Sequence, residues 1–166
     1  MSEVSEKTII LSHESQQEID KWLAKYPENR RRSAVIPALH IVQKQCGGWL
    51  PKQAIDAVAD YIGIERIAVY EVATFYSMYE MKEVGKHKLA VCTNISCMLA
   101  GSDEIVAHME NRLGIKLGET TADGKFTLKE VECLGACRCA PVLHYNNKYY
   151  ERLTPETIDE LLESLE

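Results

Sequence analysis

Two pairs of cysteines constrain what this chain can fold into more than any other feature of its sequence. Cys92 and Cys97 enclose four residues, and Cys133 and Cys137 enclose three. The two pairs are separated by 35 residues, 98 to 132, so only a folded unit that closes this gap brings all four thiols together. Convergent thiols are typical of a metal site.

Four thiolates bind either Zn²⁺ or an iron–sulfur cluster, and the spacing within each pair favours the cluster. Structural zinc sites prefer pairs separated by two residues, whereas each iron of a [2Fe–2S] cluster is reached from its own side by a wider loop. The pattern is not that of a plant-type ferredoxin, which places three ligands in one loop, nor that of a Rieske centre, since the chain has no Cys-x-His pair. Four ordinary buried thiols would not explain the pairing.

Composition indicates a soluble intracellular protein. No apolar run approaches the roughly 18 residues of a membrane span, although 46% of the 166 residues are hydrophobic. The start of the chain lacks the basic-then-apolar order of a secretory signal, so we expect the six cysteines to lie in the reducing cytoplasm and to act as ligands before disulfides. The formal net charge of −6 argues against nucleic acid as a partner. The basic run 30–32 is expected to be a solvated helix start or a local docking contact.

The N-terminal half is predicted to form a polar, mobile tail over residues 1–12 and a small helical bundle over residues 13–81 that docks to a partner. Apolar residues recur at helical spacing in four segments separated by Gly or Pro. The predicted helices run from the N-cap Ser12 to Pro27, from about 33–36 to Gly47, from Pro51 to Gly63, and from Ile64 to about Tyr79.

Residues 82–166 show a different pattern, with the order β-α-β-β-β-α. The expected elements are a strand over 88–92, a helix from the N-cap Ser102 to Gly114, a strand from 126 that leads to Cys133, a hairpin over 142–151 around Asn146-Asn147, and a helix from Thr154-Pro155. A right-handed crossover makes the first two strands parallel, which places both cysteine loops at one edge of the sheet. The predicted fold class is therefore α+β, a helical bundle followed by an α/β domain whose arrangement resembles thioredoxin.

The residues around the cysteines resemble a known family. The motifs are Cys92-Thr-Asn-Ile-Ser-Cys97, Glu132-Cys133-Leu-Gly-Ala-Cys137 with Ala140-Pro141, Tyr70-Glu-Val-Ala-Thr-Phe-Tyr76, Pro37-Ala-Leu39 and Gly48-Trp-Leu-Pro51. Over residues 20 to 165 or so, the chain resembles the thioredoxin-like [2Fe–2S] subunit of NADH:quinone oxidoreductase, the respiratory complex I, and most of all the E subunit of the bacterial enzyme. Related subunits occur in NAD-linked hydrogenases and formate dehydrogenases, which remain an alternative assembly.

The resemblance implies one [2Fe–2S] cluster per chain, bound by Cys92, Cys97, Cys133 and Cys137. It also implies an electron-transfer subunit with no substrate site of its own, next to the flavin-bearing, NADH-oxidising subunit and the other subunits of the peripheral arm. The chain would lie at the cytoplasmic face of the inner membrane through the complex, without inserting into the membrane or binding nucleic acid.

The remaining candidate residues point to no other chemistry. Spacing alone leaves Cys139 as a competitor for the iron, whereas the resemblance assigns Cys137; Cys46 is expected to lie in the helical core. The five histidines form no ligand or catalytic spacing, and no acid–base pair or phosphate-binding loop is present. Two functions of other classes remain: a thiol oxidoreductase, although the chain lacks Cys-x-x-Cys, and a zinc-stapled adaptor.

Overall fold

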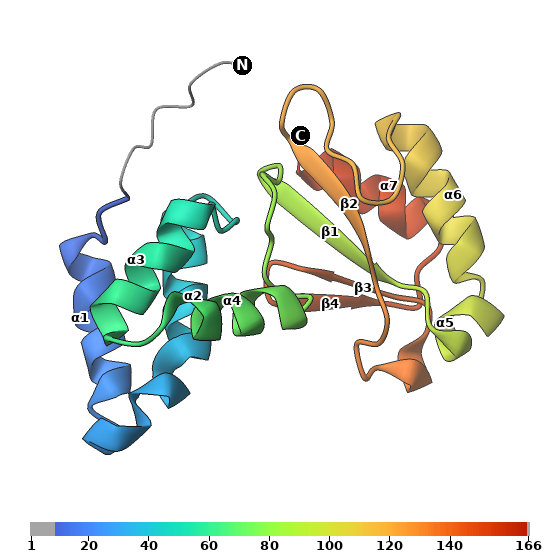
Figure 1. Ribbon diagram of the computed structural model, residues 1–166. Helices are drawn as coiled ribbons and strands as arrows, with labels where there is room; N and C mark the ends of the chain where they lie inside the picture. The colour runs from blue at the N-terminus through green and yellow to red at the C-terminus, as the bar shows by residue number, and fades with distance from the viewer. Residues whose placement is uncertain (1–8, 166) are drawn as a thin grey trace. The chain divides into compact units, whose positions relative to one another are not determined.

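The chain divides between Glu83 and Val84 into a helical unit and a unit built on a β-sheet (Figure 1). The computed structural model describes residues 9–165. Among these residues, no helix combines the length and the apolar character that crossing a membrane requires. Helices followed by a mixed sheet confirm the predicted α+β class.

Over residues 9–83, the helical unit contains four α-helices and one 3₁₀ helix around a single apolar core. Its elements are α1 (His13–Leu23), η1 (Glu28–Ala34), α2 (Val35–Gln45), α3 (Lys52–Ile62) and α4 (Arg66–Phe75). The core side chains are contributed by every α-helix, and the largest fully buried ones are Ile19, Leu39, Leu50, Ile55 and Ile62. Burial of such side chains is the main source of stability for helices this short.

Local signals set several helix boundaries as predicted. The Ser12 hydroxyl accepts the N–H of Ser15 (3.1 Å), so Ser12 caps α1. Gly63 ends α3 in the left-handed conformation (φ 77°), which costs glycine little because it has no Cβ. Pro37 is the third residue of α2, where its missing N–H has no acceptor within the helix.

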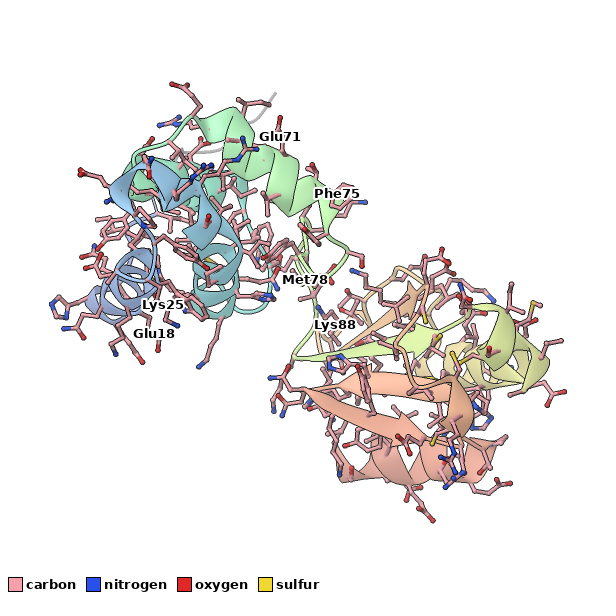
Figure 2. The ribbon with its side chains drawn as sticks, turned by 90° about the horizontal axis from the view of Figure 1, so that it is seen from below. Glu18, Lys25, Glu71, Phe75, Met78 and Lys88 are labelled. Atoms are coloured by element: carbon pink, nitrogen blue, oxygen red, sulfur yellow. The ribbon has the colours of Figure 1, made fainter. Side chains whose placement is uncertain are left out.

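The 3₁₀ helix η1, which periodicity did not predict, carries the basic run 30–32. The guanidinium of Arg31 donates to the carbonyl of Ile62 at the end of α3 (Nε–O 2.8 Å). Arg32 forms an exposed ion pair with Glu71 of α4 (Nη2–Oε2 2.6 Å), and Figure 2 labels Glu71 on that helix. Two of the three arginines therefore have partners within their own unit.

Helix α4 ends at Phe75, four residues before the predicted end at Tyr79, so the sequence prediction is wrong here. The side chain of Gln43 in α2 binds the backbone of the next segment, donating to the carbonyl of Met78 (3.2 Å) and accepting the N–H of Glu80 (2.8 Å). Tyr79 is buried in the core. These tertiary contacts turn the chain inward and end the helix, although its local propensity would continue.

Part of the predicted mobile tail, residues 9–12, is held against α2. Leu11 is buried in the core. The side-chain amide of Gln45 donates to the carbonyl of Ile10 (3.1 Å), and its oxygen accepts the N–H of Ser12 (3.1 Å). No sequence pattern indicated these contacts, and the rest of the predicted tail lies outside the described residues.

The second unit is a four-stranded sheet with two long helices. Its elements are β1 (His87–Cys92), α5 (Ile95–Leu99), α6 (Ser102–Leu113), β2 (Phe126–Val131), η2 (Cys137–Cys139), β3 (Val142–Tyr145), β4 (Lys148–Glu151) and α7 (Pro155–Ser164). The strand order is β2-β1-β3-β4; β1 and β2 are parallel and the other neighbours antiparallel, as predicted. Helices α6 and α7 run side by side along the sheet (Figure 1) and share one core with β1, β2 and β3.

The turns and helix starts of this unit agree with those predicted from the local residue types, with one exception. Asn146 and Asn147 have positive φ (48° and 60°) and join β3 to β4 as a two-residue hairpin loop. Thr154 and Thr157 form a capping box at the start of α7. Ser102, the predicted N-cap of α6, is instead the first helical residue and is fully buried, so this assignment is wrong.

Candidate metal centre

The parallel pair β1–β2 brings the two cysteine loops to one edge of the sheet. Cys92 is the last residue of β1 and lies opposite Val131, the last residue of β2. The N–H of Thr93 continues the ladder to the carbonyl of Val131 (3.2 Å), and Cys133 follows two residues later. The crossover predicted from the sequence thus places both loops where their thiols can meet.

Cys92 and Cys97 form the buried half of the site. Cys97 lies on α5, a short helix not predicted from the sequence, and both residues are almost fully buried (3% and 2% exposed). Burial above all, together with a hydrogen bond to Cys92 and the charges of Cys92 and Cys137, raises the pKa of the Cys97 thiol to about 11.

Cys133 and Cys137 form the exposed half of the site. The backbone between them turns at Gly135, whose φ of 72° favours glycine. In this conformation, the N–H of Gly135 points at the sulfur of Cys133 (3.4 Å). An amide aimed at a sulfur stabilises negative charge on it, as metal-bound thiolates require.

The structure separates Cys139 from Cys137. A hydrogen bond with Glu151 at the end of β4 raises the pKa of the Cys139 thiol, and burial raises it further. The carbonyl of Cys139 accepts the N–H of Arg152 (2.8 Å). Cys139 is therefore tied to the end of β4, whereas Cys137 is exposed.

Glu132 makes contacts with the other cysteine loop. The amide of Asn94 donates to the carboxylate of Glu132 (Nδ2–Oε2 3.4 Å), and the thiol of Cys92 donates to the carbonyl of Glu132 (3.6 Å). The sequence placed Glu132 near the ligands but did not indicate its partners. Glu132 therefore links the two loops that carry the thiols.

The remaining candidates have partners or surroundings of their own. Cys46 is half-buried at the end of α2, in the helical unit, and burial raises the pKa of its thiol. His108 pairs with Asp159, whereas His87 is buried in the sheet against Tyr145 (Nδ1–Oη 2.7 Å). These contacts give both histidines a structural role.

The donor set has the chemistry of a two-iron cluster. The four thiols come from two loops, one buried and one exposed, and the exposed loop supplies an amide donor to sulfur. Two loops with two thiols each match a [2Fe–2S] cluster, in which each iron has its own ligand pair.

The helical unit contains an open cleft of about 600 Å³ with a charged lining. Arg66 pairs there with Asp60 (2.8 Å) and Asp56 (3.3 Å), while Tyr61 donates to Asp20 (2.9 Å). These pairs connect α3 with α4 and with α1.

Comparison with known proteins agrees with the geometry. The model of the thioredoxin-like [2Fe–2S] ferredoxin family matches residues 19–166. The E subunit of the NADH-quinone oxidoreductase of Rickettsia felis is 52% identical over 141 residues, which are 85% of this chain and 84% of that protein. The corresponding E 2 protein of Rhizobium meliloti is 48% identical over 148 residues, 89% of this chain and 86% of that protein.

A similar fold occurs in a longer chain of known structure. The air-oxidized NAD⁺-reducing [NiFe]-hydrogenase superposes on 79% of this chain with a TM-score of 0.68, and the match covers 22% of the hydrogenase chain. The sequence identity is 22%, so this likeness concerns the fold alone.

Proposed function

This chain belongs to the thioredoxin-like [2Fe–2S] ferredoxin family, and from that membership we propose that it is the one-electron carrier subunit of an NADH:quinone oxidoreductase. The observation that carries the proposal is the meeting of two cysteine loops at one edge of the sheet, in a chain about half identical to such E subunits over most of its length. A subunit of this kind transfers electrons between proteins.

We assign the ligands of one [2Fe–2S] cluster to Cys92, Cys97, Cys133 and Cys137. The pairing of buried with exposed thiols and the separation of Cys139 towards β4 support this set. When bound, the cluster supplies a site that takes up and releases one electron.

The residues around the thiols have distinct tasks in this proposal. Cys92 and Cys97 would hold the inner side of the cluster, where water is excluded, because both residues are almost fully buried. The N–H of Gly135 stabilises the thiolate of Cys133 and so favours the reduced state. The carboxylate of Glu132, exposed between the loops, disfavours the added electron.

The partner that delivers the electron is the flavin-bearing, NADH-oxidising subunit, and the complex lies at the cytoplasmic face of the membrane. The helical unit contributes to assembly, since it holds none of the assigned ligands and exposes large apolar side chains. Phe75, labelled at the end of α4 in Figure 2, is 79% exposed, and Ile67 on the same helix is 69% exposed. Surfaces of this kind are often covered in complexes.

The test is to purify the full chain anaerobically and to measure iron, sulfide, absorption and electron paramagnetic resonance. Two irons and two sulfides per chain, charge-transfer absorption and a signal on one-electron reduction are expected. A colourless chain with one zinc supports an adaptor, and a colourless chain without metal supports a thiol enzyme; either result contradicts the proposal.

The assembly needs a second measurement. Affinity purification of the tagged chain from its own cells is expected to recover the flavin-bearing subunit together with quinone-reducing activity in the membrane fraction. Recovery of hydrogenase or formate dehydrogenase subunits in their place would assign the chain to another NAD-linked complex.

A further inference from the structure

The short helix α5 has an unusual distribution of side chains. It buries the thiol of Cys97 and exposes three large apolar side chains, Ile95, Met98 and Leu99, at 67%, 46% and 79%. None of the three belongs to the core of its unit. Helix α5 therefore turns its apolar side chains to the outside, where they do not stabilise the fold.

These three side chains lie in an uncharged stretch beside the candidate cluster. The chain carries no charged residue from Val91 to Gly101. Figure 1 shows α5 at the same end of the sheet as the loop that carries Cys133 and Cys137, which follows the pairing of Cys92 with Val131. A protein that covered α5 would thus come directly against the exposed half of the site.

The border of this surface is mainly acidic. Four exposed carboxylates lie on the adjoining segments, Asp103 and Glu104 in the first turn of α6 and Glu130 and Glu132 at the end of β2. Arg138 is an exposed cation of the neighbouring loop. An apolar centre with an acidic border fits a partner whose own apolar face is bordered by Lys and Arg.

We propose that Ile95, Met98 and Leu99 form the docking surface for the protein that exchanges electrons with the cluster, a partner with an apolar face and a basic border. This inference rests on the proposed function and adds the surface that the redox partner contacts. A second copy of the chain fits less well, because two acidic borders would then face each other. Covering α5 also shields the site from water on its exposed side, which strengthens the electrostatic interactions there.

The test uses the full chain with its cluster and, as the probe, the purified flavin-bearing, NADH-oxidising subunit from the same organism. Leu99→Glu places a carboxylate in the middle of the apolar surface. Its affinity for the flavin subunit is expected to fall at least about tenfold, as for a central contact of an interface, with slower reduction of the cluster by NADH. The matched control is Tyr149→Glu on β4, where a 47% exposed aromatic is replaced at the sheet edge; its affinity is expected to stay within about twofold of wild type.

The electron paramagnetic resonance signal of each isolated variant is recorded first, so that loss of the cluster is not mistaken for loss of docking. If Leu99→Glu loses its signal, Met98→Gln, a milder polar change in the same surface, takes its place, with a weaker but measurable loss of affinity expected. The inference is overturned if the variant that keeps its cluster signal binds the flavin subunit with the affinity of wild type. So would a concentration-dependent dimer of wild type that Leu99→Glu dissociates while binding of the flavin subunit is unchanged. A wild-type chain that purifies without iron refutes the proposed function instead.

Discussion

Cys137 and Cys139 stand two residues apart in one short helix, yet their thiols have different surroundings. The thiol of Cys137 is exposed, whereas the thiol of Cys139 is half-buried and hydrogen-bonded to Glu151 of β4. Replacing each in turn therefore separates a ligand from its neighbour.

Cys137→Ala is expected to abolish or strongly alter the electron paramagnetic resonance signal of the reduced, anaerobic protein, because one iron loses a ligand. Cys139→Ala is the matched control and is expected to keep the native signal, with at most a modest shift of potential. Loss of the signal in Cys139→Ala with retention in Cys137→Ala would move the ligand to Cys139.

A second residue-scale prediction concerns the pH dependence of stability. The hydrogen bond from His108 (Nε2–Oδ1 2.9 Å) and the nearby Arg112 guanidinium hold the pKa of the Asp159 carboxyl below its ordinary value of 3.8. A depressed pKa means that the stabilisation is present above the unfolded value and is lost as the pH falls through the folded value. Asp159→Asn is expected to lower the midpoint of urea unfolding slightly at pH 7. Below the pKa of Asp159 in the folded protein, the variant is expected to match wild type.

The control for that experiment is Glu160→Gln, which removes an exposed carboxylate from the next position of α7. Its urea midpoint is expected to follow wild type at both pH values. A constant difference between Asp159→Asn and wild type across the acid range would show that packing, not the ion pair, is responsible.

Residue spacing predicted the two cysteine pairs and their edge of the sheet, but it did not choose between Cys137 and Cys139. The difference in their surroundings comes from β4, whose Glu151 meets Cys139 only after the hairpin forms. The bond between Asn94 and Glu132 was unpredictable for the same reason.

At the scale of elements, boundaries set by local chemistry were predicted and those set by tertiary contacts were not. Gly63, Asn146-Asn147 and Thr154 stop or start elements through their own conformations or side chains. By contrast, α4 stops at Phe75 because Gln43 binds the backbone beyond it, and that contact is invisible to periodicity. Helix α5 was missed because five residues are too few to show a helical repeat.

The loops that carry the thiols are expected to depend on the metal for their order. Uncompensated thiolates repel each other, and loops freed from a metal regain conformational entropy. Removing iron with a chelator should raise amide hydrogen exchange over residues 92–100 and 133–140, measured by mass spectrometry. The buried core of α6 and α7 serves as the internal reference, and unchanged exchange in both loops would exclude a structural role for the cluster.

At the scale of the whole molecule, the two units are predicted to have separate functions. All four proposed ligands, the complete sheet and its core lie after Glu83, so a fragment of residues 82–166 should bind a cluster by itself. Iron and sulfide analysis with circular dichroism of the purified fragment checks this. A folded fragment without iron would contradict it.

The complementary deletion tests the helical unit. Removal of residues 1–80 leaves the proposed ligands in place but takes away the exposed apolar side chains of α4. The shortened chain is expected to keep its signal and to lose most of its assembly into the complex, measured by co-purification. Full assembly of the shortened chain would leave the helical unit without a docking role.

The unequal burial of the four thiols predicts an order of reactivity in the metal-free chain. Cys133 and Cys137 are exposed, whereas Cys92 and Cys97 are covered. Brief treatment with iodoacetamide should therefore label Cys133 and Cys137 first, because the alkylating reagent reaches Cys92 and Cys97 only when the loop over residues 92–100 opens. Peptide mass spectrometry at increasing reaction times checks this order.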